Sequence, residues 1–213
     1  MTTSENWDDL AAVTALSDGV RRSAYRVVAD GGPEPVGRDE VAETLGVGRT
    51  LAAFHLDKLV DAGLLEVSYA RRTGRSGPGA GRPAKLYQVA RWEHSVSVPP
   101  RAYRSAAEML AEAVERGGAD QALFDVAREQ GRERPAGDPA AALAERGYSP
   151  VAEDGRIELR NCPFHRLAEQ FPPLICGMNL ALIDGMVAGS EWTARMDPAP
   201  GRCCVTLSKN NFD

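Results

Sequence analysis

The sequence predicts an α+β protein with two domains that are joined by an amphipathic helix. Three observations support this. An apolar stripe at helical spacing ends at Gly63, and two short alternating segments around a basic, glycine-rich stretch follow it, which predicts a helix and a β-hairpin. A second helical stripe fills residues 101–116, between a proline pair and a glycine pair. Further on, Asp154-Gly155 separates two short segments as in a tight hairpin, with helical patterns on both sides.

The N-terminal domain is expected over residues 10–92, after a frayed terminus. Its first helix is capped at Ser17-Asp18 and stopped by Gly31-Gly32-Pro33. Two more helices follow with a short turn between them. Their apolar faces are Val41, Ala42 and Leu45, then Ala52, Leu56 and Leu59, and the turn is Gly46-Val47-Gly48. Leu64 to Tyr69 and Leu86 to Val89 are predicted to be the strands of the hairpin.

Charge is distributed unevenly along a chain whose net charge is -5. The first 92 residues are neutral overall, and residues 67–92 contain no aspartate or glutamate. B-DNA accepts an α-helix in its major groove and cationic loops at its phosphates. We therefore expect the N-terminal domain to approach DNA through this local basic patch, while the acidic remainder is repelled.

The segments DEVAETLGVGRTLAAFHLDKLVDAGLL and GRPAKLYQV together resemble the ArsR/MarR-like winged-helix transcription regulators, over about residues 10–91. The resemblance implies a winged helix-turn-helix and a homodimer that binds a pseudo-palindromic double-stranded operator. DNA contacts are expected from the second helix of the motif and from the wing. The predicted residues are Arg49, Thr50, Ala53, Phe54 and Lys58 on the helix, and Arg71, Arg72, Arg75, Arg82 and Lys85 on the wing.

Phe54 is unusual on a polar helix face, and two interpretations stay open. It could contact a thymine methyl group in the major groove, or pack on a neighbouring helix. The wing cations are expected to bind phosphates or the minor groove rather than base edges in the major groove.

Residues 93–118 form the predicted link between the domains. Its helix carries six apolar residues on one face: Tyr103, Ala106, Ala107, Leu110, Ala113 and Val114. This face either packs on the core of its own subunit or forms a dimer contact, and the two are compatible.

The C-terminal domain is expected over residues 119–213, as an α+β sensor domain. Helices are predicted at 120–130, 139–146, 164–170 and 174–189, a hairpin at 148–161 and a terminal strand at 203–208. All four cysteines of the chain lie in its last quarter. The N-terminus lacks the features of a signal peptide, so we expect a cytoplasmic protein, in which cysteines favour metal or redox roles over structural disulfides.

The cysteines are expected where secondary-structure elements begin or end. Cys162 lies between a strand and a helix, and Cys176 in the first turn of the 174–189 helix, where the dipole favours a thiolate. Cys203 and Cys204 begin the last strand, in which neighbouring side chains point to opposite faces. Only one of the two is therefore expected to join Cys162 and Cys176, and Cys203 is favoured. The alternative is that some of these are ordinary buried thiols.

The spacing of the cysteines indicates which metal they would hold. Thirteen residues separate Cys162 from Cys176 and 26 separate Cys176 from Cys203, unlike the closely spaced pairs of zinc fingers. Iron–sulfur clusters tolerate wide spacing and can take a histidine ligand. His165, three residues after Cys162, is either a candidate for that ligand or an ordinary surface or partly buried histidine.

This combination of a winged helix and a wide three-cysteine pattern is similar to the iron–sulfur-sensing repressors of the suf cluster-assembly operon. The resemblance implies that Cys162, Cys176 and one of Cys203 or Cys204 hold a 4Fe-4S or 2Fe-2S cluster, and that the loaded dimer represses transcription. Alternatives are a winged-helix regulator that senses an organic ligand, zinc or thiol redox state. The sequence shows no catalytic constellation or phosphate-binding loop, so an enzyme is not expected.

Overall fold

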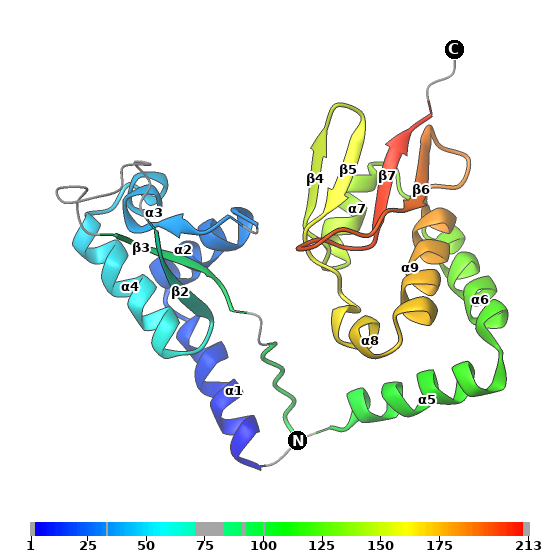
Figure 1. Cartoon of the computed structure of the whole chain (residues 1–213), viewed down its shortest axis with the longest axis horizontal. Coiled ribbons are helices and arrows are strands. Elements are labelled where there is room, and N and C mark those ends of the chain that lie inside the picture. The colour runs from blue at the N-terminus through cyan, green and yellow to red at the C-terminus, as the bar shows by residue number, and fades with distance from the viewer. Residues whose placement is uncertain (1–2, 33, 71–82, 91–92, 100, 211–213) are drawn as a thin grey trace. The chain divides into compact units, whose positions relative to one another are not determined.

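The computed structural model describes residues 3–32, 34–70, 83–90, 93–99 and 101–210 of the chain (Figure 1). The fold is mixed α+β with two antiparallel sheets, as the sequence predicts. The chain divides into two units, Met1–Arg101 and Ala102–Asp213, and each is considered by itself. Four residues with predicted DNA contacts lie outside the described residues: Arg71, Arg72, Arg75 and Arg82.

The first unit contains helices and a small antiparallel sheet. The described helices are α1 (Thr3–Ala15), α2 (Gly19–Asp30), α3 (Arg38–Leu45) and α4 (Arg49–Asp61), and the strands are β1 (Val36–Gly37), β2 (Leu65–Ala70) and β3 (Ala84–Val89). The strand order is β1-β3-β2, and the register of β2 with β3 runs from Leu65 opposite Val89 to Ala70 opposite Ala84. Helix α1 differs from the frayed terminus that was predicted, and its Ala12 is buried in the core.

Local sequence signals account for the helix ends of this unit. Asp18 caps α2, and its side chain accepts a hydrogen bond of 2.8 Å from the backbone N–H of Arg21. Gly46 ends α3 with a φ of 64°, a conformation that costs other residues energy. The predicted inner face of α4 is confirmed, because Ala52, Leu56 and Leu59 are all fully buried. The opposite face of α4 is thereby held outward.

The second unit packs helices against a four-stranded antiparallel sheet. The described helices are α5 (Tyr103–Gly117), α6 (Asp120–Glu133), α7 (Pro139–Glu145), α8 (His165–Gln170) and α9 (Pro172–Met186). The strands are β4 (Pro150–Glu153), β5 (Arg156–Leu159), β6 (Trp192–Met196) and β7 (Val205–Lys209), in the order β4-β5-β7-β6. The predicted hairpin is confirmed, with positive φ at Asp154 and Gly155 between β4 and β5. Strand β6 was not predicted.

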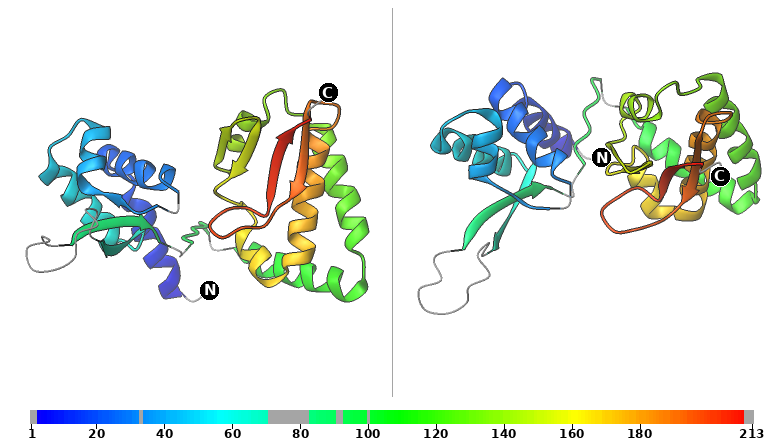
Figure 2. Two further views of the ribbon diagram at one scale, coloured as in Figure 1. Left: turned by 45° about the horizontal axis from the view of Figure 1, so that its top comes forward. Right: turned by 90° about the horizontal axis from the view of Figure 1, so that it is seen from above.

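Helix α9 is the centre of this unit. Its Ile183 and Met186 pack in one cluster with Ile157, Val205 and Leu207 of the sheet. On its other side α9 runs alongside α6, as both views of Figure 2 show. None of the helices in the described ranges is long and apolar enough to cross a membrane.

Candidate metal centre and nucleic-acid interface

The four cysteines come from three segments of the second unit that are distant in sequence. Cys162 lies in the turn between β5 and α8, Cys176 in α9, and Cys203 and Cys204 in the segment that leads into β7. All four are free thiols, and Cys203 is 3% exposed while the others are half-buried. The fold thus brings residues that are about 40 positions apart in the chain into one region.

The thiols contact one another in a continuous chain. The side chain of Cys162 contacts Cys203, Cys203 contacts Cys204, and Cys204 contacts Cys176. Both Cys203 and Cys204 thus contact the other thiols, although the sequence favours only one of them as a metal ligand. That expectation placed both residues in the last strand, but β7 begins at Val205, so the alternation of strand side chains does not apply to them.

The thiol of Cys203 accepts several hydrogen bonds. Asn179 Nδ2 donates to its sulfur at 3.3 Å, and the backbone N–H of Val205 donates at 3.5 Å. The thiols of Cys162 and Cys204 also donate to it, and together these donors lower the pKa of Cys203 to about 3, against the opposing effect of burial. The pKa values of Cys162 and Cys204 are raised because their thiols donate to Cys203 and because they are partly desolvated. The group thus favours one thiolate, at Cys203.

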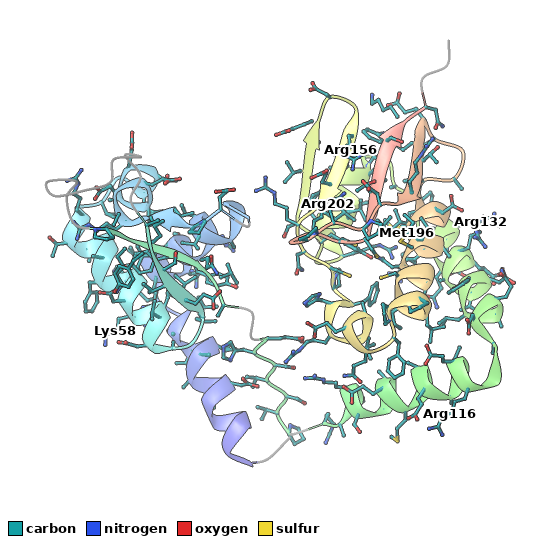
Figure 3. The ribbon with its side chains drawn as sticks, in the orientation of Figure 1. Lys58, Arg116, Arg132, Arg156, Met196 and Arg202 are labelled. Atoms are coloured by element: carbon teal, nitrogen blue, oxygen red, sulfur yellow. The ribbon has the colours of Figure 1, made fainter. Side chains whose placement is uncertain are left out.

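The segment that carries Cys203 and Cys204 is fixed by its backbone and by ion pairs. The N–H of Cys203 donates to the carbonyl of Leu159 at 2.7 Å, which ties the segment to β5. Asp197, at the other end of this loop, is bound by Arg156 and by Arg202, whose Nη2 lies 2.8 Å from Asp197 Oδ2. Figure 3 labels the two arginines beside the sheet of this unit. These hydrogen bonds from Arg156 and Arg202 lower the pKa of Asp197. The two cysteines are therefore presented by an ordered loop.

The structure also corrects the predicted position of Cys176, and it places His165 on the surface, as one of the two interpretations of this residue expects. Helix α9 begins at Pro172, so Cys176 lies in its second turn, beyond the first turn where the helix dipole acts most strongly. His165 is the first residue of α8, its side chain is 66% exposed, and its Nε2 lies 3.3 Å from Glu169 Oε1. The imidazole is thus paired with a carboxylate on its own helix rather than with the thiols.

The donor chemistry of this group fits a thiolate-binding metal. Soft sulfur ligands select zinc, copper(I) and iron–sulfur clusters. Within the described ranges, no three histidine, cysteine or acidic side chains are grouped so that they could hold a metal ion as they stand. Metal binding would require the thiols to turn toward a common centre, which rotation between staggered χ1 positions can provide.

In the first unit, the outer face of α4 carries the predicted DNA-contact residues. Arg49 and Thr50 are exposed at the start of the helix, and Arg49 Nε lies 3.2 Å from Asp39 Oδ1. Phe54 is 52% exposed and meets the ring of His55 edge-on, with 5.3 Å between ring centroids. Half of this aromatic side chain is thus open to a ligand. Ala53 is half-buried and Lys58 is exposed, with its Nζ 3.2 Å from Asp61 Oδ2.

Asp57 is a residue of this face whose role the sequence does not reveal. Lys85 Nζ of β3 lies 2.6 Å from Asp57 Oδ1, and the hydroxyl of Tyr87 donates to the same oxygen at 2.9 Å. Desolvation acts to raise the pKa of Asp57, but the hydrogen bonds from Lys85 and Tyr87 outweigh it and lower the pKa. Lys85, predicted to bind phosphate, is therefore already partnered by a carboxylate. The contact spans 28 positions, so no local pattern indicates it.

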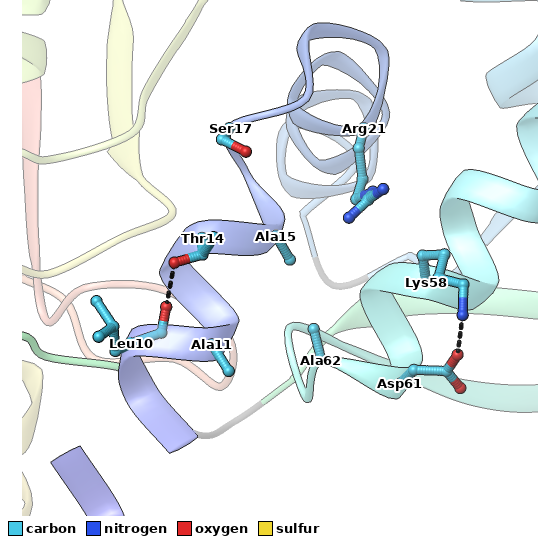
Figure 4. Close-up of a pocket in the computed structure, with 9 residues that line it drawn as sticks. All are labelled: Leu10, Ala11, Thr14, Ala15, Ser17, Arg21, Lys58, Asp61 and Ala62. Atoms are coloured by element: carbon cyan, nitrogen blue, oxygen red, sulfur yellow. Dashed lines mark hydrogen bonds and ion pairs between the residues drawn. The ribbon is translucent and has the colours of Figure 1, made fainter. Parts of the chain in front are cut away.

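A surface hollow lies beside α4 in the same unit (Figure 4). It is lined by Leu10, Ala11, Thr14, Ala15, Ser17, Arg21, Lys58, Asp61 and Ala62. Thr14 donates to the carbonyl of Leu10 at 2.7 Å, and Lys58 pairs with Asp61. Thr14, Lys58 and Asp61 are therefore engaged locally, whereas the Nε of Arg21 is buried without a hydrogen-bond partner.

No protein-family model matches the chain, and no curated protein matches it.

Proposed function

We propose that the chain is a sequence-specific, DNA-binding transcriptional regulator, a repressor by its resemblance, whose operator affinity is controlled by an iron–sulfur cluster bound to its cysteines. The observation that carries the proposal is the chain of contacts among the four thiols of the second unit. Four buried or half-buried cysteines without disulfides form a soft donor set, in which Cys203 is favoured as a thiolate.

The DNA-binding part of the proposal is a winged helix-turn-helix in the first unit. In this scheme α3 and α4 are the two helices of the motif, and the hairpin of β2 and β3 is the wing. Helix α4 enters the major groove, where the exposed ring of Phe54 contacts a thymine methyl group. The arginines of the wing, which lie outside the described residues, neutralise phosphates.

The sensing part of the proposal assigns Cys162, Cys176, Cys203 and Cys204 as ligands. The bound cluster would supply an inorganic redox centre whose assembly depends on iron and sulfide, which makes it suitable as a signal. The amide of Asn179 and the backbone N–H of Val205 hold the Cys203 sulfur by hydrogen bonds, as is common for cluster ligands. Zinc is the alternative metal, because four thiolates also suit a structural zinc site.

The experiment that tests this proposal is the absorption spectrum and metal content of protein purified without oxygen. We expect broad visible bands together with iron and sulfide. A colourless protein that contains zinc would favour the zinc site instead. A colourless, metal-free protein that loses titratable thiols on oxidation would favour a thiol switch. A colourless, metal-free protein whose thiol count does not change on oxidation would favour a sensor of an organic ligand. Footprinting of loaded and metal-free protein then tests whether the cluster controls a symmetric operator.

The proposed homodimer is supported by the exposed side of α5. The structure divides the apolar face that was predicted for this helix. Val114 packs against buried Ala111 of the same unit and Ala107 is half-buried. Tyr103 and Leu110 stay 75% and 66% exposed. They alternate with exposed Ala106 and Ala113 at the three- and four-residue spacing of a coiled-coil seam.

An antiparallel α5 pair would place each large residue of this seam on a small one. Tyr103 of one copy would cover Ala113 of the other, and Leu110 would cover Ala106. Such pairing of large with small residues fills the space between two helices at close approach. We therefore propose that a second copy of the chain covers this face.

Leu110→Glu is expected to convert the dimer into a monomer. Each Leu110 buried in the interface contributes about 2 kcal/mol, and the two-fold axis doubles the loss, so the dimer dissociation constant should rise by more than about a hundredfold. Light scattering on a sizing column measures this. Ser105→Glu is the control, since Ser105 is exposed on α5 but outside the seam. A dimer that persists in Leu110→Glu would exclude this interface.

Asp57→Asn is expected to tighten binding to every duplex. It removes a negative charge from the DNA-facing helix and releases Lys85 for a phosphate contact, so the salt slope should steepen by about one. Fluorescence anisotropy over a range of salt concentrations measures both effects. Glu43→Gln on α3 is the control for net charge, since Glu43 is exposed and distant in sequence from Lys85. If Asp57→Asn instead relaxed the preference at a single C·G pair, Asp57 would be reading a base.

A further inference from the structure

Asn179 is a buried amide in the most apolar helix of the second unit. It is 1% exposed, and its neighbours on α9 include the buried Ile175, Ala181 and Ile183. Burying an amide in apolar surroundings is costly unless its polar atoms are hydrogen-bonded. A leucine of similar volume would fill the same space without that cost. The presence of asparagine therefore requires an explanation from its partners.

The amide of Asn179 joins a tyrosine to a proposed metal ligand. The hydroxyl of Tyr148, which is 4% exposed, donates to Asn179 Oδ1. Asn179 Nδ2 in turn donates to Cys203 Sγ at 3.3 Å. Because the tyrosine hydroxyl occupies the carbonyl side of the amide, the NH₂ side is turned toward the sulfur. The three residues come from β4's leading turn, from α9 and from the segment before β7.

The Cys203 sulfur receives a second N–H from the backbone of Val205, at 3.5 Å. Two N–H donors on one buried sulfur stabilise negative charge on that atom more than a lone backbone contact does. The backbone donor follows from the chain path into β7, whereas the Asn179 donor depends on two side chains. Substitution of Asn179 or Tyr148 can therefore change the hydrogen bonding of the Cys203 sulfur, whereas the backbone donor of Val205 stays in place.

We propose that Asn179, oriented by Tyr148, is a positioning residue that holds Cys203 as a metal ligand and raises the reduction potential of the bound cluster. This inference rests on the proposed function. One electron from an added reductant increases the negative charge on the ligand sulfurs, and the Asn179 N–H stabilises that charge. Hydrogen bonds to ligand sulfurs are among the factors that set cluster potentials.

The test is the double variant Tyr148→Phe/Asn179→Leu, because it separates this role from a structural one. Replacing both partners of a buried hydrogen bond by apolar groups of the same shape is nearly neutral for folding. Because the Cys203 sulfur keeps the N–H of Val205, we expect the metal-free variant to stay folded with a thermal stability close to that of the wild type. In the loaded protein, titration with dithionite should show about a tenfold lower ratio of reduced to oxidised cluster at a fixed potential, which is a shift of about 59 mV for one electron.

Two further variants sharpen this test. Asn179→Asp places a carboxylate against the Cys203 sulfur and is expected to lose bound iron. Thr193→Val is the matched control, since it removes a side-chain hydrogen bond to Asn210 at the other end of the β6–β7 hairpin and should leave the potential unchanged.

A loaded double variant with the potential and visible spectrum of the wild type would overturn the inference while leaving the proposed function intact. Wild-type protein that binds no iron under anaerobic reconstitution would instead overturn the proposed function, and this inference with it. The two failures are distinguished by the wild-type sample alone.

Discussion

Gly131→Ala is expected to lower the free energy of unfolding of the second unit by roughly 3 kcal/mol or more. This is a large effect for a substitution that adds one methyl group. A Cβ at Gly131 of α6 would lie 2.2 Å from the carbonyl oxygen of Leu182 and 2.8 Å from the backbone nitrogen of Met186. Both atoms belong to the backbone of α9, so no side-chain rotation can relieve the overlap. The two helices would have to separate, which would open the packing between them.

The reciprocal contact supports this expectation. A Cβ at Gly185 of α9 would lie 2.2 Å from the carbonyl oxygen of Arg128 on α6. The two glycines thus set the distance between α6 and α9 from both sides, and Gly185→Ala should have a similar effect. Since α9 carries Cys176 and Asn179, a shift of this helix should also lower the iron content of the loaded protein.

Hydrogen exchange measured on peptides of the second unit detects this destabilisation in the full-length chain. Gly137→Ala is the matched control, because Gly137 is exposed and an added Cβ there has no atom within 4 Å. Equal exchange in Gly131→Ala and Gly137→Ala would show that α6 and α9 do not approach through these glycines.

Elements with a strong local signal could be predicted from the sequence. The inner face of α4 follows from apolar residues at helical spacing, and Leu56 and Leu59 are fully buried as expected. The hairpin of β4 and β5 follows from Asp154-Gly155, which adopt the positive φ that such turns require. In both cases the signal lies within a few residues, where side-chain chemistry restricts the backbone directly.

Features that depend on where an element begins, or on distant partners, could not be predicted in the same way. The start of β7 at Val205 places Cys203 and Cys204 outside the strand, and a shift of two residues decides whether both can contact the other thiols. The bond from Asn179 to Cys203 joins positions 24 apart. Strand β6 was missed because its register is determined by pairing with β7 rather than by its own short sequence.

Cys176→Ser is expected to lose the cluster and, with it, most of the operator affinity. Cys176 is the single thiol of the group that α9 supplies, and it contacts the others through Cys204. A serine hydroxyl is a harder and weaker ligand than a thiolate, so iron should be lost or bound substoichiometrically. His165→Ala is the matched control, because His165 is exposed and paired with Glu169, and it should keep its iron.

The effect on DNA binding follows from linkage between the two proposed sites. A cluster can change operator affinity only by binding more tightly to one dimer geometry than to the other. A preference of about 1–3 kcal/mol gives a change of about 5- to 150-fold, and the resemblance implies that the loaded dimer is the tighter binder. Helix α5 begins two residues after the end of the first unit, so it is the covalent route by which order in the second unit could reach the helices proposed to bind DNA.

We would measure the iron content and the operator affinity of Cys176→Ser together, on protein purified without oxygen. The two values distinguish a sensing cluster from a structural one and test whether Cys176 is a ligand. Loss of iron with a matching fall in affinity supports sensing through the cysteines. A variant with its full complement of iron would remove Cys176 from the ligand set and leave Cys162, Cys203 and Cys204 to hold the metal. A variant that loses its iron yet binds the operator as tightly as the wild type would make the cluster structural, because a site without differential affinity for two states cannot shift the equilibrium between them.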